Sequence, residues 1–394
     1  MIDDIAHDCP TLVRSDSAVR MLLACAGFGP PVPVEGQGIV AGDLFAHALD
    51  QRVAPWLCVN LVDQCPDWIS HREDMMFRRY LDARRAASAV GLAQLAQIVS
   101  AMTAAGVKAV PFTGPVLAQL VYDDPALCQF DELDLLIDPA QAERALAVLE
   151  RLGYRTALAD LTPGRLRAYH RYSGQDSLLA DGKLSVVAHW AAAPRCLSMQ
   201  IDVSAIIDRA DSVIVGGHIV PCLSVEDSAL LLAIRASTDQ WRRVRPAQDL
   251  AALAVRYPLM DWDIVLVRAH QYGLRRAMLL ALLLAVDVFH APIPVDLLAV
   301  ARHDPHCRAL AQMVRGGIGA PVREPASMFR LSRFLWSVRE RRIDRLSYTW
   351  RTLTLAGVPH FRAVALPEAL AFLYPLVRWG QTMMALPLWR RWRR

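Results

Sequence analysis

Two acidic side chains at alternate positions of a short apolar segment are the residues of this sequence best suited to chemistry. Glu132 and Asp134 lie in the run FDELDLLID, which has the composition of a β-strand. Residues i and i+2 of a strand point to the same face, so the two carboxylates project together. Leu133 and Leu135 then face the core. One helix upstream, Gly114 forms a turn between a strand and a helix.

Paired carboxylates beside a glycine turn suit the binding of a divalent metal and a phosphate. Carboxylate oxygens are ligands that Mg²⁺ prefers, and the backbone N–H groups of a helix N-terminus bind anions. A glycine lets these N–H groups approach a phosphate without a Cβ in the way. The alternative is an exposed acidic strand edge that binds nothing.

The order FTGP, helix, ELDLLI, helix resembles the uncharacterised nucleotidyltransferases of the DNA polymerase β-like superfamily. Their pattern is Lys-Gly followed, after one helix, by Gly-Asp-x-Asp-Leu-Leu, and the likeness extends from about Gly42 to the C-terminal tail. The resemblance implies that Glu132 and Asp134 are catalytic and bind Mg²⁺ or Mn²⁺. It also implies that Thr113 and Gly114 lie against the triphosphate of an NTP.

Several polar positions of the family motif differ here, so the motif is degenerate. Thr113 stands where the family usually has Lys, and Glu132 where it has Asp. The family also has a third acid just before a His, which His189 matches as a catalytic residue. The position of that acid falls on Val187 or Ala188, and we align it with Val187. Loss of a carboxylate from a site that must hold two dications weakens metal binding.

A second polar group, in LLLAIRASTDQWRRVRPAQDLA, is expected to complete the nucleotide site. The family has His and Lys groups near Arg235 and Asp239, and a Trp where this chain has Trp241. The resemblance therefore assigns Arg235, Asp239 and Trp241 to nucleotide binding. The alternative for Arg235 and Asp239 is an i, i+4 ion pair on a helix surface. The run WRRVR that begins at Trp241 either lines a groove for an anion or is a solvated helix end.

Two functions are compatible with these residues. In the first, the chain is a nucleotidyltransferase that moves a nucleoside monophosphate from an NTP to a hydroxyl or phosphate acceptor, on a small molecule or peptide, in a biosynthetic pathway. In the second, it is a pseudoenzyme that binds a peptide, a protein or a nucleotide without transfer. The expected partners of the chain are a nucleotide and an acceptor. The net charge of +4 gives no indication of specific nucleic-acid binding.

The hydrophobic pattern predicts strands among many helices and a mainly helical C-terminal half. The resemblance implies an α+β fold with a small mixed sheet of the polymerase β type surrounded by helices. Beside the strand that carries the two acids, strands are expected at 107–112, 154–158, 170–179 and 184–190. We divide the chain into an N-terminal arm and loop, a helical subdomain, the α/β core, a helical domain, and a basic Trp-rich tail, at residues 1–41, 42–106, 107–220, 221–318 and 319–394.

Composition indicates a folded protein, with 54% hydrophobic and 21% charged residues. The eight cysteines form no CxxC pair, and the N-terminus has no basic region followed by an apolar run, so a cytoplasmic location is expected. The tail LPLWRRWRR alternates Trp with Arg, which suits a peripheral contact with a membrane or an acidic partner. The alternative is a docked terminal helix with a basic end.

Overall fold

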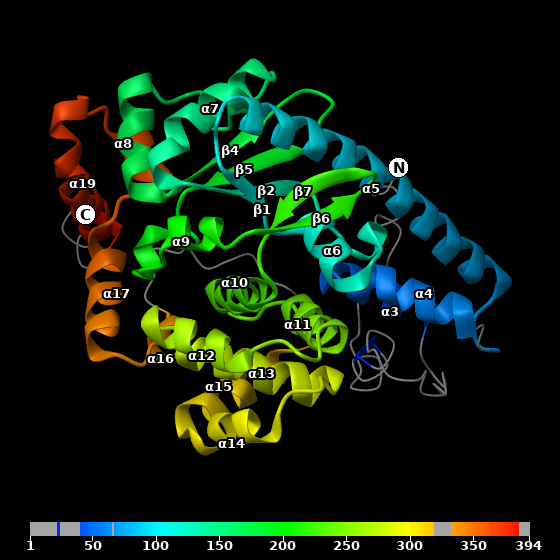
Figure 1. Cartoon of the computed structure of the whole chain (residues 1–394). Helices are drawn as coiled ribbons and strands as arrows, with labels where there is room; N and C mark the ends of the chain where they lie inside the picture. Colours follow the sequence, from blue (N-terminus) through cyan, green and yellow to red (C-terminus); the bar gives the residue numbers. More distant parts are fainter. Residues whose placement is uncertain (1–21, 24–39, 65–66, 319–331, 386–394) are drawn as a thin grey trace, which may run out of the picture.

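The computed structural model describes residues 22–23, 40–64, 67–318 and 332–385. Its architecture is α+β, as the sequence predicts: a five-stranded sheet and a two-stranded hairpin lie among helices (Figure 1). Most of the predicted N-terminal arm and the end of the predicted tail lie outside the described residues.

The five-stranded sheet has the order β1-β2-β5-β4-β3. Strands β2 and β5 are parallel, and the other neighbours are antiparallel, so the sheet is mixed. A separate antiparallel hairpin is formed by β6 and β7. The strands are β1 (Ala109–Pro111), β2 (Glu132–Ile137), β3 (Arg155–Thr156), β4 (Gln175–Leu179), β5 (Ser185–His189), β6 (Asp211–Val215) and β7 (His218–Cys222).

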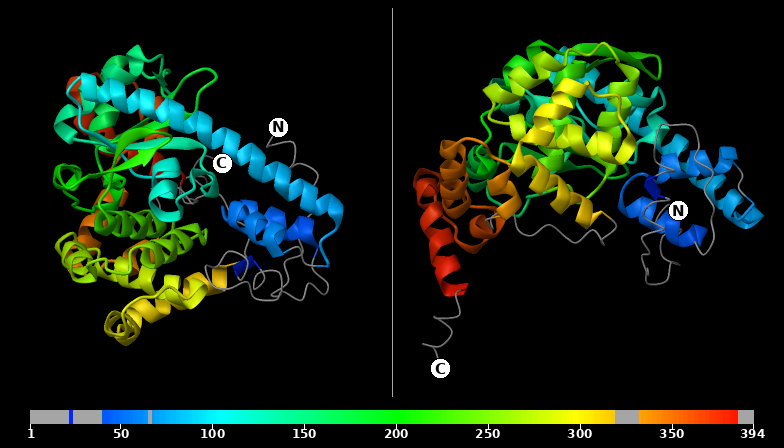
Figure 2. Two further views of the ribbon diagram at one scale, coloured as in Figure 1. Left: turned by 45° about the vertical axis from the view of Figure 1, so that its right-hand side comes forward. Right: turned by 90° about the horizontal axis from the view of Figure 1, so that it is seen from below.

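One face of the sheet is covered by helices that precede and follow β2. The long α5 (His71–Ala104) starts at a capping box, in which Ser70 and Glu73 bond each other's backbone N–H groups. It runs from the N-terminal helices to the sheet (Figure 2). There its Leu95 and Ile98 enter the same buried cluster as Leu133 and Leu135 of β2. The other helices of this half are α3 (Ala41–Asp50), α4 (Ala54–Gln64), α6 (Gly114–Tyr122), α7 (Ala142–Arg151), α8 (Pro163–Ser173) and α9 (Val203–Asp208), with 3₁₀ turns η1 (Pro125–Leu127), η2 (Pro139–Gln141) and η3 (Arg195–Leu197).

Among the described residues, α5 is the one helix long and apolar enough to cross a bilayer by length and composition. A core helix meets the same two criteria. In this fold, 39% of the apolar stretch of α5 is buried.

The strand predicted over 170–179 is wrong in its first half. Residues Pro163–Ser173 form α8, and the strand begins only at Gln175. Pro163 occupies the first helical turn, and Gly174 ends the helix with a φ of 77° in the left-handed region. The Pro and Gly at the two ends favour a helix over a strand here. His170 therefore lies on a helix.

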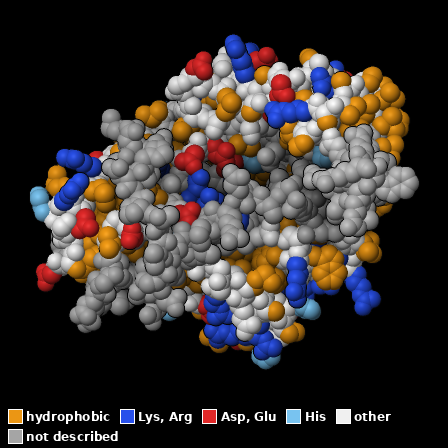
Figure 3. Space-filling model, turned by 180° about the vertical axis from the view of Figure 1, so that it is seen from behind, with side chains coloured by type: hydrophobic (Ala, Val, Ile, Leu, Met, Phe, Trp, Pro, Cys, Tyr) orange, Lys and Arg blue, Asp and Glu red, His pale blue; other side chains and the backbone are white. Residues whose placement is uncertain are grey.

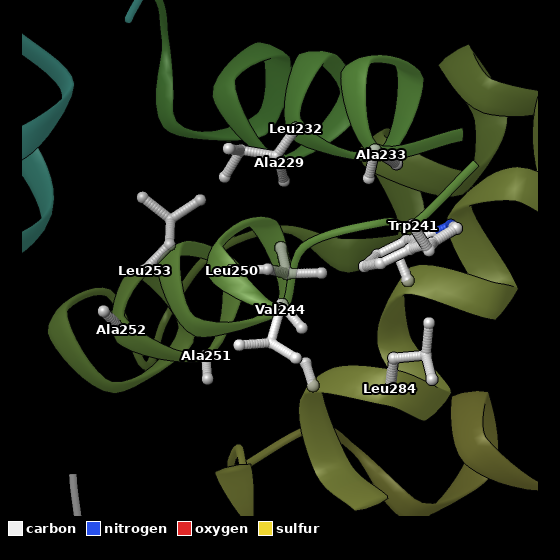
Figure 4. Packing of buried hydrophobic residues seen from close by; sticks show 14 of the residues in the cluster. Ala229, Leu232, Ala233, Trp241, Val244, Leu250, Ala251, Ala252, Leu253 and Leu284 are labelled. Carbon is white, nitrogen blue, oxygen red and sulfur yellow. The ribbon is translucent and has the colours of Figure 1, made fainter. Parts of the chain in front are cut away.

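The second half is mainly helical, as predicted, and the packing of its core is shown in Figure 4. Trp241 follows the end of α10 and lies between Ala233 and Leu284, with 6% of its surface exposed. The Ser224 hydroxyl accepts from the backbone N–H of Asp227, as expected of a capping residue. These helices are α10 (Val225–Thr238), α11 (Arg245–Arg256), α12 (Trp262–Gln271), α13 (Arg275–Phe289), α14 (Val295–His303) and α15 (Pro305–Gly317).

The C-terminal helices stand together at one end of the molecule (Figure 2, right). Helix α17 packs against η3, and α19 packs against α17 and η4. Their bounds are α16 (Arg333–Ser337), α17 (Arg342–Thr354), α18 (Val358–Ala363), η4 (Glu368–Leu373) and α19 (Tyr374–Ala385).

Candidate functional site

Strand β2 presents its two acids on one face, as predicted from the alternation. Leu133 and Leu135 are buried in the core on the other face. Asp134 is itself buried, with 4% of its surface exposed, whereas Glu132 is exposed at the start of the strand. The two carboxylates therefore share a face but occupy different environments.

Three side chains from three elements hold the Asp134 carboxylate. The Thr113 hydroxyl donates to Oδ2. His189 Nε2, at the end of β5, lies 2.7 Å from Oδ1. A guanidinium nitrogen of Arg235, on α10, lies 3.3 Å from Oδ2. Both carboxylate oxygens are thus engaged, and strands and helices far apart in the sequence meet at this one group.

The charges around Asp134 lower its pKa. Burial by itself would raise the pKa of a carboxyl group, but Arg235, His189 and Thr113 outweigh it and hold the pKa well below its usual range. Burial lowers the pKa of His189, against the opposing effect of Asp134. A neutral imidazole that donates its Nε2–H to an ionised Asp134 satisfies both directions.

The Phe112 ring, directly after β1, contacts two of the side chains that hold Asp134. The ring lies edge-on to His189, with centroids 5.2 Å apart. The Arg235 guanidinium lies 5.4 Å from the centre of the same ring, within the range of a cation–π contact. Arg235 therefore has two fixed neighbours, the Phe112 ring and the Asp134 carboxylate.

Glu132 has no hydrogen bond or ion pair with any residue that the structure describes. Burial of part of the carboxyl group, and then the charge of Asp134, raise the pKa of Glu132. Arg235 and Arg52 act in the opposite direction, so both guanidinium groups lie near it. Glu132 is therefore an exposed carboxylate with two guanidinium groups nearby.

The position of the family's third acid is filled by an apolar side chain. Strand register pairs Asp134 with Val187 and Leu135 with Ala188, so Val187 is on the Asp134 face. Of the two candidate positions, Val187 therefore lies beside Asp134, and Ala188 does not. Val187 is 4% exposed and carries no ligand atom.

This set of side chains does not fit a centre for two divalent metals. Mg²⁺ requires oxygen ligands in near-octahedral geometry, and Asp134 has no oxygen that is not already engaged. Over the described ranges of the chain, no three His, Cys, Asp or Glu side chains are grouped closely enough to hold a metal ion. Glu132 is left as the one carboxylate of the predicted pair with free oxygens.

The glycine turn is present where the sequence predicts it. Gly114 begins α6 with a φ of 62°, in the left-handed region that glycine adopts without strain. Thr113 precedes the helix in the N-cap position, but its hydroxyl makes no bond to the helix. That hydroxyl is directed to Asp134 instead.

The remaining predicted binding residues have other contacts in the structure. Asp239 pairs with Arg242 and Arg243, so the i, i+4 pair between Arg235 and Asp239 that the sequence left open is not formed. Trp241 lies in the hydrophobic core, and its side chain is assigned to packing.

Sequence reasoning missed Arg52 as a member of the site. Arg52 follows α3 and forms an ion pair with Asp131, which precedes β2. Its carbonyl oxygen accepts from the buried guanidinium of Arg245, which also binds Asp249 at 2.6 Å. The run WRRVR was the available signal, since Arg243 and Arg245 both bind the segment around Arg52; Arg243 bonds Asp50 O.

The mixed sheet, the acid pair on β2 and the glycine turn before α6 define a nucleotidyltransferase-like α+β protein. Residues 39–290 match the family described as uncharacterised nucleotidyltransferase, and the chain belongs to that family. The match ends at residue 290, whereas the sequence analysis expected the resemblance to extend to the C-terminal tail. No curated protein matches the chain.

Proposed function

We propose that this nucleotidyltransferase-like protein binds a nucleotide through its triphosphate, at the arginines around Glu132, and holds no resident pair of metal ions there. One observation carries the proposal: the Asp134 carboxylate is already neutralised by Arg235, a cation supplied by the chain itself. Asp134, which we expected to bind a metal ion, is therefore paired with an arginine instead.

The arginines around Glu132 support an anionic ligand. Burial lowers the pKa of Arg243, and nearby Arg52 lowers it further. Asp131 pairs with Arg52, and Asp239 pairs with Arg243, so these two carboxylates offset part of this repulsion. A polyphosphate placed between the guanidinium groups would relieve the rest, and guanidinium groups bind phosphate with two parallel hydrogen bonds.

Arg235 is suited to contact the same ligand. Its side chain is 39% exposed, although one edge lies against Asp134. A guanidinium has five N–H donors, so donors remain for a phosphate. The Phe112 ring fixes its plane. In this proposal, Arg235 is shared between Asp134 and the ligand, and its remaining N–H donors bind the phosphate that a metal ion contacts in metal-dependent transferases.

A second candidate function is transfer of a nucleoside monophosphate to an acceptor, and Glu132 favours it. Its carboxylate has no partner among the described residues and shares a face with Asp134. Mg²⁺ is often bound by one or two carboxylates plus substrate phosphates. Glu132 would then hold a metal that arrives with the NTP. A small molecule or a peptide in a biosynthetic pathway is the acceptor in this alternative.

Calorimetric titration with ATP, GTP, CTP and UTP tests the first proposal. We expect at least one nucleotide to bind in EDTA, with Mg²⁺ changing its dissociation constant by less than about threefold. Arg235→Gln should weaken binding about tenfold, since charged hydrogen bonds contribute about 1.5–3 kcal/mol. The matched control is Arg256→Gln, which removes an exposed arginine paired with Asp123 and should leave binding unchanged.

Pyrophosphate release separates the two candidates. The first proposal predicts none above background with Mg²⁺ or Mn²⁺. Release that requires the metal and disappears in Glu132→Gln, with acceptor present, would contradict it and support transfer. Absence of nucleotide binding in EDTA would also count against the first proposal.

A further inference from the structure

Helix α17 carries a stripe of exposed apolar side chains, which we call the α17 stripe. Its members are spaced by three and four residues, so they lie along one side of the helix. Each is at least 43% exposed among the described residues, a degree unusual for contiguous large apolar side chains. The members and their exposed fractions are Ile343 65%, Leu346 66%, Trp350 64% and Leu353 43%.

Neighbouring elements extend this apolar surface. Trp379 of α19 donates from its indole N–H to Leu353 O at 3.0 Å, which joins α19 to the end of the α17 stripe. Trp379 is 46% exposed, and Leu376, one turn earlier, is 65% exposed. Phe372, just before α19, is 66% exposed. Figure 3 shows hydrophobic side chains, with basic ones beside them, along the edge of the molecule that carries these helices in Figure 1.

The opposite side of α17 is anchored in the protein. Tyr348 and Thr352 are fully buried there. Arg351 donates to Arg195 O at 3.1 Å, which ties α17 to η3. The α17 stripe is therefore the outward side of a helix whose inward side already has its partners.

This end of the chain is also strongly basic. Residues 333–394 contain twelve Arg, no Lys and three acidic residues, a net charge of +9, although the whole chain has a net charge of only +4. Half of the ten Trp residues lie in the same segment. Arg342 is exposed and, by helical spacing, lies on the same side as the stripe. The segment lies outside residues 39–290, which match the family.

We propose that the α17 stripe and the apolar side chains of α19 form a surface that docks on an anionic lipid bilayer. Helices that lie in a bilayer interface combine an apolar side bearing Trp and Leu with Arg or Lys. Each basic residue near an anionic leaflet adds attraction, which salt weakens. A second copy of this chain is the poorer occupant, because two segments of the same positive net charge would then lie against each other.

Co-sedimentation with vesicles tests this surface in the full chain. We expect binding to vesicles of phosphatidylcholine with phosphatidylglycerol, and at least about tenfold weaker binding to phosphatidylcholine alone. Raising the salt concentration should weaken the binding to the anionic vesicles. Equal binding to both lipids would overturn the proposal.

A triple substitution tests the stripe itself. Ile343→Ser/Leu346→Ser/Trp350→Ser replaces side chains that are mostly exposed, so the fold is retained and circular dichroism checks it. Binding to anionic vesicles should fall about tenfold or more. The matched control, Ile219→Ser/Leu259→Ser/Val295→Ser, changes side chains that are 75%, 96% and 76% exposed elsewhere and should bind as before.

Two results would overturn the assignment of the stripe. One is unchanged vesicle binding by the triple variant. The other is a stable dimer of the unmodified chain in light scattering that the triple variant converts to a monomer, because the surface would then be occupied by a second copy.

Discussion

Two Asp–His pairs lie on opposite faces of the same sheet, and their carboxylates differ in what neutralises them. Register pairs Asp134 with Val187 but Asp176 with Ala188, and neighbouring residues of β5 point to opposite faces. Asp134 is held by its histidine, a hydroxyl and a guanidinium. Asp176 has a comparable histidine, His170, at 3.1 Å, but no guanidinium bonds it among the described residues.

The second pair lies at a groove of about 860 Å³ between α7, α8 and the strand edge. Arginines line this groove, but Arg167 and Arg171 bind Glu368 rather than Asp176. An Asp–His pair by itself therefore does not define a site. What distinguishes the Asp134 pair is its contact with Arg235, which lies on α10, about a hundred residues further along the chain.

The largest expected effect comes from restoring the third acid. Val187→Asp places a second buried carboxylate beside Asp134, with one arginine to neutralise both. We expect the free energy of unfolding in EDTA to fall by about 3–5 kcal/mol, the range for an uncompensated buried charge. Urea titration measures the change. Ser185→Asp, on the same strand face but half-buried, is the control and should cost much less. Equal losses of unfolding free energy in the two variants would show that burial of the new carboxylate at position 187 does not cause the destabilisation.

Removing the arginine should have the next largest effect. Arg235→Ala leaves Asp134 buried with only His189 and Thr113, and we expect a loss of about 2 kcal/mol in urea titration, reduced because Arg235 is partly exposed. Arg167→Ala on the opposite face removes an exposed pair with Glu368 and should leave the free energy of unfolding unchanged. Similar losses for both variants would contradict the distinction drawn between the two pairs.

A smaller effect is expected in the pH dependence of stability. The folded-state pKa values of Asp134 and His189 are both lowered. Each group then contributes stability that is present above its unfolded pKa, about 3.9 for Asp and 6.5 for His, and lost as pH falls toward the folded value. Unfolding midpoints measured from pH 7 to pH 4 should therefore fall less steeply for His189→Gln than for the unmodified chain. A slope that stays the same in the variant would contradict this assignment.

The alternation of ELDLLI was sufficient to predict which face of β2 carries Glu132 and Asp134, because strand periodicity is local. The helices of the C-terminal half were predicted from helical periodicity, which is local as well. The error at residues 170–173 was also local, because Pro163 and Gly174 bound a helix there and were not taken into account.

The contacts that decide the chemistry were not readable from the sequence. Arg235 reaches Asp134 across the fold, and Arg52 reaches Asp131 across 79 residues. Their partners depend on how separate elements pack, which no motif records. The sequence offered Asp239 as the partner of Arg235 because it is four residues away, and packing selected a different acid.

The most direct test of whether Arg235 has taken the place of a metal at Asp134 is a titration with Mn²⁺ in the absence of nucleotide. Electron paramagnetic resonance detects the free Mn²⁺ during this titration. The free Mn²⁺ signal should persist at micromolar protein, and it should be the same for Asp134→Asn. Loss of the free signal at one or two equivalents, restored by Asp134→Asn, would contradict the account.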